Sequence, residues 1–487
     1  MANPGSKTKE KVVIKEIDSN IDLLKVFHYS HTRSGSFFLD SALQNQKTGR
    51  YSFIGYDPFL TIMSKGDNIL IQDRQGITKK KGNPFGELRN LLSRFLRLDN
   101  NSEPVPFTGG AVGYFAYDLC HFIERLPNTT IDDIGFPAMY FNFYDTIIGF
   151  DHVENKCYIV SVNCSPYSGK STEERIGQIS KTINHRLSIP HEEETRARQS
   201  SAKRKIISNF SREDYLRAVE RAKRYIQEGD IYQVNLSQRF QTQVEIQPYE
   251  LYRRLRKINP APFSCYLKLD NKYIISSSPE RFLSVRNTSA RTAEHKNTLI
   301  RKVQTRPIKG TRPRCNHEDV NMKMKKELLS SKKDDAELAM IVDLERNDLG
   351  RVCDYNTVKV TEKKELEEYP TVYHLVATVE GELHSQYDTI DLIKATFPGG
   401  SITGAPKIRA MQVIDELEPT RRNVYTGAIG YIGFNGNIDL NIAIRTFLVK
   451  DDHVYFQAGG GIVADSNPEE EYEETLHKAK ALINTLE

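Results

Sequence analysis

The chain has 487 residues, of which 38% are hydrophobic and 27% charged, a composition typical of a globular protein with room for one large domain or two ordinary ones. Its 68 basic and 64 acidic residues give a net charge of +4, which makes no case for nucleic-acid binding, and no apolar run reaches membrane-spanning length. The start, MANPGSKTKEKVVIKEI, lacks the apolar core of a signal peptide and the six cysteines form no CxxC pair, so we expect a cytoplasmic protein without a zinc site or a disulfide framework.

Short stretches that alternate apolar and polar residues between turn residues fill the first half of the chain, which predicts a sheet-rich lobe. These stretches are SFFLDSA, RYSFIGYDPFLTIMS, NILIQD, AVGYFAYDL, YFNFYDTIIGFDH and KCYIVSVN. Residues 166–206 lose this period and gain charge, which predicts a helix followed by an exposed linker. We therefore divide the chain into an N-terminal lobe at 1–190, a charged linker at 191–206 and a second region at 207–487.

A helix and a strand open the second region. Ser211 is a suitable N-cap, and the buried stripe that follows it ends at Gly229. From Ile231 to Phe240 the period changes to two, which places Gln233, Asn235, Ser237 and Arg239 on one polar face. A strand face of this kind either lines a binding site or is exposed to solvent, and solvent exposure is the commoner explanation for a polar face.

The segment QTRPIKGTRPR at 304–314 surrounds Lys309 with turn residues and arginines. Pro307 restricts the backbone on one side of the lysine and Gly310 frees it on the other, so the amine is presented from a defined turn. Three neighbouring arginines, at 306, 312 and 314, would lower the pKa of Lys309 and hold an anionic substrate. The alternative is a solvated basic turn.

Carboxylates recur at helical spacing near two predicted helices. Asp334 and Glu337 lie three residues apart at the start of a helix that runs to Leu349. Ser466 and Pro468 open a terminal helix, in which Glu471, Glu474 and Lys478 share one side. Each set is either an ordinary charged face or part of a site.

Two glycine-rich stretches could bring ligands close to the backbone. FPGGSITGAPK at 397–407 leads into a helix with Pro406 suited to its first position, but its spacing is not that of a phosphate-binding loop. Gly459, Gly460 and Gly461 follow the strand HVYFQA. Arg445, in a strand-like segment, is a candidate clamp for a carboxylate.

Several long motifs in one order resemble the chorismate-binding enzymes. They are SPERF at 278–282, RPIKGT at 306–311, MIVDLERNDLGRV at 340–352, FPGGSITGAPK at 397–407, GGGIVADS at 459–466 and EYEETLHKA at 471–479. The N-terminal lobe resembles the family more weakly, through PFTGGAVGYFAYDL and FLDSA. The resemblance implies an α+β fold with two large antiparallel β-sheets packed as a central sandwich, flanking helices and strands from both halves of the chain.

The resemblance implies that Glu280 is a general acid and Lys309 a covalent nucleophile toward chorismate, with His374 also catalytic unless it is a core imidazole. Members that add water carry a lysine where this chain has Gln233, so ammonia is the implied nucleophile. Lysine in PIKGT is typical of the aminodeoxychorismate branch, which serves folate synthesis, whereas alanine there is typical of the anthranilate branch. The anthranilate reaction and a non-catalytic chorismate- or tryptophan-binding subunit remain as alternatives.

The resemblance also implies ligands for these positions. Magnesium is expected at Glu337 and Glu474, with Asp334 and Glu471 as indirect partners. The remaining substrate residues are Gln233, Thr403, Gly404, Tyr425, Arg445, Gly459, Gly460, Gly461 and Lys478. Ser41 resembles the serine of a tryptophan pocket, and a glutamine amidotransferase chain is the expected source of ammonia, because no glutaminase motif is visible here.

The chain departs from the family at a few positions. Leu338 stands where the family usually has a histidine, and Asp334 is shorter than the usual glutamate. Residues 286–302 form a basic insertion, which we expect to be a surface hairpin.

Overall fold

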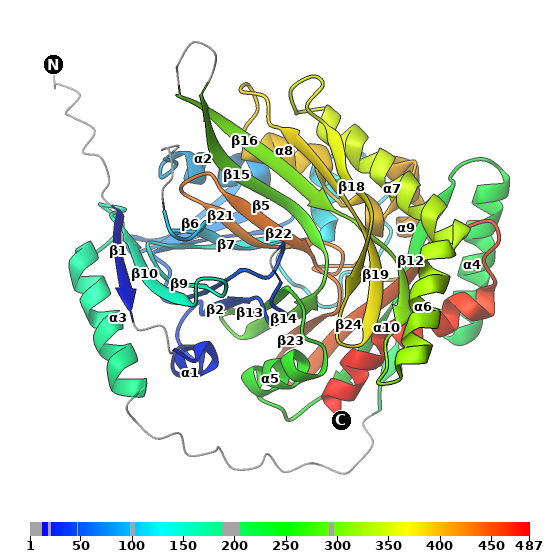
Figure 1. The fold of residues 1–487 in the computed structure, drawn as a ribbon, viewed down its shortest axis with the longest axis horizontal. Coiled ribbons are helices and arrows are strands. Elements are labelled where there is room, and N and C mark those ends of the chain that lie inside the picture. The colour runs from blue at the N-terminus through cyan, green and yellow to red at the C-terminus, as the bar shows by residue number, and fades with distance from the viewer. Residues whose placement is uncertain (1–11, 18–20, 46, 98–102, 188–204, 292–296) are drawn as a thin grey trace.

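The computed structural model describes residues 12–17, 21–45, 47–97, 103–187, 205–291 and 297–487. This part of the chain forms two sheets of 12 strands each, and every pairing between named strands is antiparallel (Figure 1). The predicted α+β class with two large antiparallel sheets is therefore confirmed.

The first sheet has its N-terminal strands at one end and its C-terminal strands at the other, and the two halves meet where β2 pairs with β13. Its strands, in order, are β1 (Val12–Ile17), β10 (Lys156–Val162), β9 (Thr146–Asp151), β3 (Tyr51–Gly55), β2 (Phe37–Asp40), β13 (Phe263–Leu269), β14 (Lys272–Ser278), β23 (Thr446–Lys450), β24 (His453–Ile462), β12 (Gln233–Gln243) and β11 (Ile207–Ser208), with β20 (Gly404–Ala405) beside β12.

The second sheet also joins the two halves of the chain, here where β21 pairs with β7. Its strands, in order, are β17 (Ile308–Pro313), β19 (Val372–Glu382), β16 (Asn297–Arg306), β15 (Arg281–Arg291), β22 (Ile438–Ile442), β21 (Ala428–Gly433), β7 (Gly110–Phe115), β8 (Met139–Tyr144), β4 (Leu60–Lys65), β5 (Asn68–Asp73) and β6 (Gly76–Lys81), with β18 (Lys359–Glu368) beside β19.

Helices cover the outer faces of the two sheets. Along the chain these are α1 (Leu23–Ser30), α2 (Pro84–Ser93), the 3-10 helix η1 (Tyr117–Phe122), α3 (Thr172–Leu187), α4 (Arg212–Gln227), α5 (Pro248–Ile258), α6 (Glu318–Ser330), α7 (Lys332–Gly350), α8 (Thr389–Thr396), the 3-10 helix η2 (Gly400–Ile402), α9 (Lys407–Leu417) and α10 (Pro468–Leu486). No helix of the described residues is long and apolar enough to cross a membrane.

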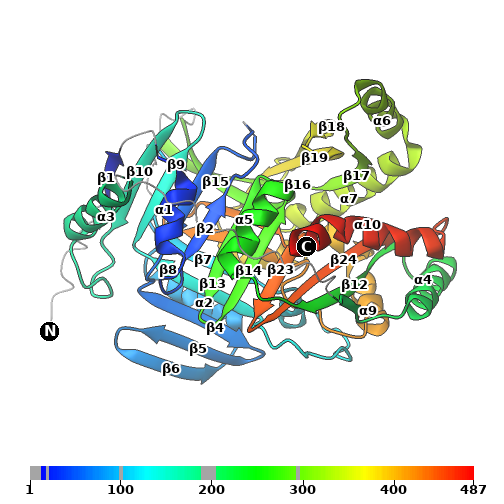
Figure 2. The ribbon, with the colours of Figure 1, turned by 90° about the horizontal axis from the view of Figure 1, so that it is seen from below.

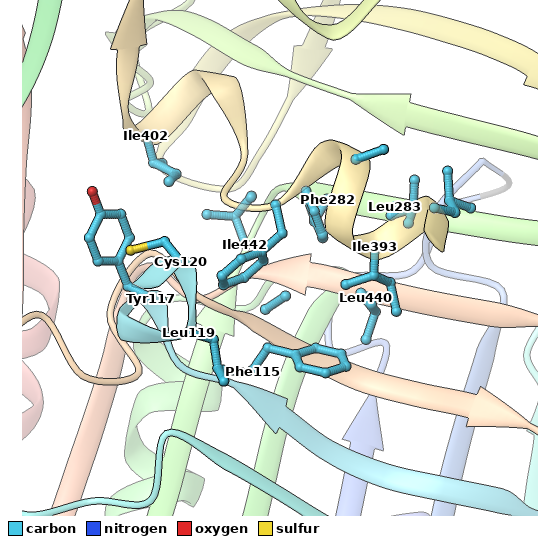
Figure 3. Packing of buried hydrophobic residues seen from close by; sticks show 14 of the residues in the cluster. Phe115, Tyr117, Leu119, Cys120, Phe282, Leu283, Ile393, Ile402, Leu440 and Ile442 are labelled. Atoms are coloured by element: carbon cyan, nitrogen blue, oxygen red, sulfur yellow. The ribbon is translucent and has the colours of Figure 1, made fainter. Parts of the chain in front are cut away.

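The hydrophobic core forms layers, one between the two sheets and others between each sheet and its helices, as expected for a sandwich. One buried cluster, with Phe53 and Leu267 from the first sheet and Tyr114 and Ile429 from the second, fills the space between the sheets. A second cluster packs α1, α3, α5 and α10 on the first sheet, and the largest packs helices that include α7, α8 and α9 on the second. Figure 3 shows part of the largest cluster.

Local signals predicted several elements correctly. Ser211 caps α4 by accepting a hydrogen bond from the amide of Asp214. The cap of α10 is Asn467, however, and the Ser466 hydroxyl instead donates to Glu471 at 2.6 Å. The predicted strands of the first half are present, and α3 lies in the stretch expected to hold a helix.

Two other predictions, the insertion at 286–302 and the linker at 191–206, concern stretches that the structure describes only in part. The insertion at 286–302 forms the outer part of a hairpin, because β15 and β16 pair with each other across it. Most of the predicted linker at 191–206 lies outside the described residues, so the division at 190 and 207 stays a prediction.

Candidate active site

One cavity of about 960 Å³ gathers most of the predicted site residues. It lies beside α10, which Figure 2 shows between the arm of α6, α7 and β17 to β19 and the strands β12 and β24. The predicted residues that line it are Glu280, Lys309, Asp334, Glu337, His374, Tyr425, Arg445, Gly459, Gly461, Glu471, Glu474 and Lys478. A pocket of this size, with a few converging polar groups, is large enough for a small-molecule substrate.

Lys309 reaches the cavity from an irregular part of β17. The next residue, Gly310, has a φ of +73°, and the pairing with β19 shifts register between Lys309 and Thr311. The Lys309 amino group donates to the Ser401 carbonyl oxygen at 3.1 Å. Burial lowers the pKa of Lys309, Glu337 opposes this shift and the charge of Lys478 adds to it. The amine is thus both positioned and closer to its neutral, nucleophilic form.

The neighbouring arginines are not the cause of this shift, contrary to our expectation from the sequence. Arg306 pairs with Glu362 and Glu367 at 3.1 and 2.9 Å, and Arg312 pairs with Glu327 and Asp334 at 2.8 and 3.1 Å. Arg314 donates to the Tyr369 carbonyl oxygen at 3.1 Å. Carboxylates neutralise the charges of Arg306 and Arg312, and burial is what lowers the pKa of the lysine.

Glu280 lies between β14 and β15, directly before Arg281, and is only 4% exposed. Its Oε1 accepts a hydrogen bond from the Ile308 amide at 3.3 Å, which joins it to the segment that carries Lys309. Burial raises the pKa of Glu280 to about 7. A carboxyl group with this pKa is partly protonated near neutral pH, as a general acid requires.

His374 and Arg445 lie together on the cavity wall. The His374 Nδ1 lies 2.9 Å from the Thr311 hydroxyl, and burial and the charge of Arg445 lower the pKa of the imidazole to about 3. Arg445 has a φ of +51°, and its guanidinium contacts Asn259 at 3.5 Å but pairs with no carboxylate of the described residues. A largely buried guanidinium without a counter-ion is suited to an anionic ligand.

Two carboxylates of α10, those of Glu471 and Glu474, lie close to Gly460. A Cβ on Gly460 would lie 3.1 Å from both Glu471 Oε2 and Glu474 Oε1. The Glu471 Oε2 atom is buried and accepts no hydrogen bond from the described residues, while Lys478 pairs with Glu474 at 2.6 Å. Burial raises the pKa of Glu471.

These residues fit a magnesium ion, although no group of three or more metal-binding side chains is preformed among the described residues. Glu337 lines the same cavity as Glu471 and Glu474. Magnesium commonly takes one or two carboxylates and completes its shell with water and substrate. Asp334 is less available, because it pairs with Arg312.

Four predicted residues lie behind the cavity wall. Gln233, Thr403, Gly404 and Gly460 are buried but do not line the cavity. The Thr403 hydroxyl donates to the Gly399 carbonyl oxygen at 3.0 Å within its own turn. A Cβ on Gly404 would lie 2.2 Å from the Gln233 carbonyl oxygen, so this glycine permits two strands to approach.

Several residues that we did not predict line the cavity, among them Asn235, Lys333 and Ser401. Asn235 stands on the polar face that was predicted for residues 231–240, and Ser401 lies within the glycine-rich stretch. Lys333 precedes the predicted carboxylate pair by one residue. Each of these residues therefore lies in or beside a sequence pattern that we singled out. None of those patterns distinguishes a site residue from one on the solvent-exposed surface.

Ser41 lies in a different cavity of about 330 Å³. Its hydroxyl donates to the Tyr51 carbonyl oxygen at 2.6 Å. The walls combine aromatic rings, including Tyr431, with Arg281 and Arg286, both of which pair with Asp439. Such walls suit an aromatic ligand with charged groups at one end.

The chain is similar to known proteins over nearly its whole length. The profile of the chorismate binding enzymes matches residues 37–484. An anthranilate synthase component 1 from Acetivibrio thermocellus is 40% identical over 98% of this chain and 94% of its own. An aminodeoxychorismate synthase component 1 from Bacillus subtilis is 37% identical over 91% of each chain. The crystal structure of anthranilate synthase component I from Streptococcus pneumoniae has a TM-score of 0.77 at 34% identity, covering 91% of this chain and 94% of that one.

Proposed function

The chain belongs to the chorismate-binding enzyme family, and we propose that it forms 4-amino-4-deoxychorismate from chorismate and ammonia, the reaction of an aminodeoxychorismate synthase component 1. The observation that supports this branch is the partly buried amino group of Lys309, which lines the cavity and donates to the Ser401 carbonyl oxygen. A cationic lysine buried without a role would be costly. A role as the nucleophile would explain why Lys309 lies in the wall of this cavity.

The first step uses Glu280 and Lys309. The neutral amine of Lys309 attacks C2 of the chorismate ring, the two conjugated ring double bonds shift, and the C4 hydroxyl leaves as water with the proton of Glu280. The hydroxyl is a poor leaving group without this proton, and the pKa of Glu280 near 7 allows the residue to supply it. The proton that the amine loses as the C–N bond forms goes to the Glu280 carboxylate, which restores the acid.

The second step releases the lysine. Ammonia attacks C4, the two ring double bonds shift back, the bond between C2 and the Lys309 nitrogen breaks, and the proton that ammonia loses goes to the departing lysine nitrogen. Chorismate and ammonia are thereby converted to aminodeoxychorismate and water through two allylic displacements. Arg445, which pairs with no carboxylate of the described residues, would bind one substrate carboxylate, and His374 beside it would be a neutral hydrogen-bonding group.

We propose magnesium as the cofactor, held by Glu337 and Glu474 with Glu471 beside them. When bound, the ion would neutralise a substrate carboxylate. The carboxylates that converge near Gly460 support this assignment, because Glu471 Oε2 is a buried acceptor without a hydrogen-bond donor among the described residues. Lys478, which pairs with Glu474, would then bind substrate or hold this glutamate in place.

We further propose that ammonia is supplied by a separate glutamine amidotransferase chain, with free ammonia as a substitute in its absence. The second cavity, around Ser41, is proposed as a tryptophan site, because its rings and paired arginines match the chemistry of that amino acid. Calorimetry with tryptophan tests this site, and Ser41→Phe should abolish the signal by filling the cavity.

Anthranilate synthase component 1 is the second candidate, favoured by the 40% identity to such a protein. Its reaction would also release pyruvate from chorismate, and Lys309 is the feature against it. Mass spectrometry of the products formed from chorismate, magnesium and ammonium distinguishes the two. Aminodeoxychorismate without pyruvate supports our proposal, and anthranilate with pyruvate overturns it.

A further inference from the structure

A third cavity lies away from both sites described above. Its volume is about 610 Å³, and it shares no lining residue with the active-site cavity or with the cavity around Ser41. Among the residues that the structure describes, its walls carry no aspartate, glutamate or arginine but five lysines: Lys65, Lys79, Lys80, Lys81 and Lys272. The other two cavities mix cationic and anionic side chains. A cavity whose charged groups are all cations attracts anions.

The register of β4, β5 and β6 decides which side chains face this lysine cavity. These strands form the outer end of the second sheet (Figure 2). Residues paired across antiparallel strands share a face, and neighbours along a strand point to opposite faces. Two rows on one face therefore cross the strands, one of Met63, Leu70 and Lys79 and the other of Lys65, Asn68 and Lys81. All six residues line the cavity, so three amino groups border two apolar side chains.

Lys80 stands in the row between these two and belongs to the opposite face. Its cross-strand neighbour is Ile69, followed on β4 by Ser64. Ile69 packs in the same buried cluster as Leu88 of α2, and the Lys80 amino group pairs with Glu87 of that helix at 2.5 Å. The charge of Lys80 is therefore neutralised on the far side of the sheet.

Lys272 lines the cavity from the first sheet, where it begins β14 and is half-buried. Burial and the charge of Lys450 lower the pKa of Lys272, Asp270 opposes this shift, and the charge of Lys65 adds to it. A Cβ on Gly135, another lining residue, would lie 3.5 Å from Lys65 Nζ. Amino groups from the two sheets thus repel each other across one space, and a bound anion would relieve this repulsion.

Three of these lysines lack a carboxylate partner. Lys65, Lys79 and Lys272 form no ion pair with any residue that the structure describes, whereas Lys81 lies 3.9 Å from Asp67. An ordinary solvated run of lysines would lie on one strand or one face. Here unpaired amino groups from both sheets surround a single cavity with an apolar floor.

We propose that the lysine cavity binds a small polyanion that carries phosphate groups. Lysine binds phosphate as a point charge, whereas a planar carboxylate is matched better by the fork of an arginine, and no arginine of the described residues lines this cavity. The phosphates lie among Lys65, Lys79 and Lys272. An apolar part of the ligand rests on Met63 and Leu70. The volume is within the usual range for a small-molecule site.

Two sources share this chemistry, a nucleotide and an inorganic polyphosphate chain. Both carry several phosphate charges, but only the nucleotide has a ring that the apolar floor can contact. ATP, tripolyphosphate and adenosine are therefore the probes, since they separate the contribution of the charge from that of the ring. Calorimetry in buffer without magnesium measures each affinity, because the free polyanions then keep their full charge.

The variant Lys65→Gln with Lys272→Gln tests the site, because it removes one unpaired charge from each sheet. Its matched control is Lys80→Gln with Lys326→Gln, which removes the same net charge from a neutralised lysine and from an exposed one on α6. Arg445→Ala shows whether a probe binds in the active-site cavity instead. Thermal unfolding without a probe shows whether each variant is folded.

We expect ATP and tripolyphosphate to bind the wild type and adenosine not to bind. The Lys65 and Lys272 double variant should weaken both affinities about tenfold or more, while the control stays within about twofold. Lys79→Gln, at an exposed edge-strand position, should weaken them in the same direction, and added salt should weaken binding to the wild type. Arg445→Ala should keep the wild-type affinity.

The comparison of the two anionic probes identifies the source of the ligand. A higher affinity for ATP than for tripolyphosphate supports a nucleotide, and equal affinities support a polyphosphate chain; both support the polyanion site. Binding of neither probe, equal affinities in the two double variants, or loss of binding in Arg445→Ala would overturn the site.

Discussion

The amino group of Lys309 lies 3.1 Å from the carbonyl oxygen of Ser401, so a residue of the irregular strand β17 is fixed against the 3-10 helix η2, almost a hundred residues later in the chain. Burial lowers the pKa of this amine. The same burial raises the pKa of Glu280, which is tied to the lysine segment through the Ile308 amide. Burial in one pocket thus prepares an acid and a nucleophile together.

Lys309→Ala should abolish the covalent adduct, because no amine remains where the lysine amine was held. Intact-protein mass spectrometry after mixing with chorismate and magnesium, without ammonia, gives the measurement. Lys326→Ala, a change of an exposed lysine on α6, is the control and should keep the adduct. An adduct that persists in Lys309→Ala would show that another group is the nucleophile.

Glu280→Gln should lower the rate of adduct formation by about a hundredfold or more, the usual contribution of a general acid. The wild-type rate requires protonated Glu280 together with the neutral amine of Lys309, so its pH dependence should contain an ionisation near pH 7, the pKa that burial gives Glu280, which Glu280→Gln lacks. Single-turnover rates without ammonia measure this, because the availability of neutral ammonia then plays no part. A wild-type rate in Glu280→Gln would remove Glu280 from the role of acid.

Arg445→Ala should raise the KM for chorismate by about tenfold to a hundredfold, the loss expected for a charge-assisted contact with a substrate carboxylate. The guanidinium pairs with no carboxylate of the described residues, so its removal breaks no ion pair within the fold. Arg346→Ala, at a half-exposed arginine paired with Asp343, is the control. An unchanged KM would place the substrate carboxylates elsewhere in the cavity.

Gly460→Ala should weaken magnesium binding, because the new Cβ would lie 3.1 Å from oxygens of both Glu471 and Glu474 and push them apart. Gly177→Ala is matched to it, since a Cβ on Gly177 meets nothing within 4 Å. Titration of magnesium by calorimetry, in the presence and absence of chorismate, gives the affinity without relying on turnover. Equal magnesium affinities in the two variants would mean that the metal is not bound beside Gly460.

Sequence predicted those parts of the site whose signals are local. The Ser211 cap, the Gly310 turn and the spacing of Glu471 and Glu474 all depend on neighbours within a few residues, and the structure shows each of them. The charge state around Lys309 could not be predicted, because Glu362, which neutralises Arg306, is brought to it only by the pairing of β18 with β19.

The polar face of β12 shows the same limit. Alternation placed Asn235 and Ser237 on one face correctly, but it could not show that Glu418 and Arg422 cover that face. These partners lie more than 180 residues later in the chain. Periodicity reports which side chains share a face, and only tertiary packing decides what that face meets.

Glu345→Gln should reduce the loss of stability at alkaline pH. Glu345 is buried on α7, its Oε2 accepts a hydrogen bond from the Thr305 hydroxyl at 2.8 Å, and burial raises its pKa from 4.5 to about 8. Because the folded state holds this proton more tightly than the unfolded state, its contribution to stability is complete below the unfolded pKa and is lost as pH rises through about 8. The neutral glutamine cannot titrate, so this part of the pH dependence disappears.

Thermal unfolding at about pH 6 and about pH 9 measures the effect as a difference in Tm. The drop in Tm should be smaller in Glu345→Gln than in wild type, whereas Glu213→Gln, at an exposed glutamate in the first turn of α4, should show the wild-type drop. Asp118 and Glu280, whose pKa values burial raises to about 7, titrate in all three proteins and supply the remaining slope. An identical drop in the three proteins would mean that Glu345 is ionised in the folded chain over this range, and that its contact with Thr305 stabilises the charged form.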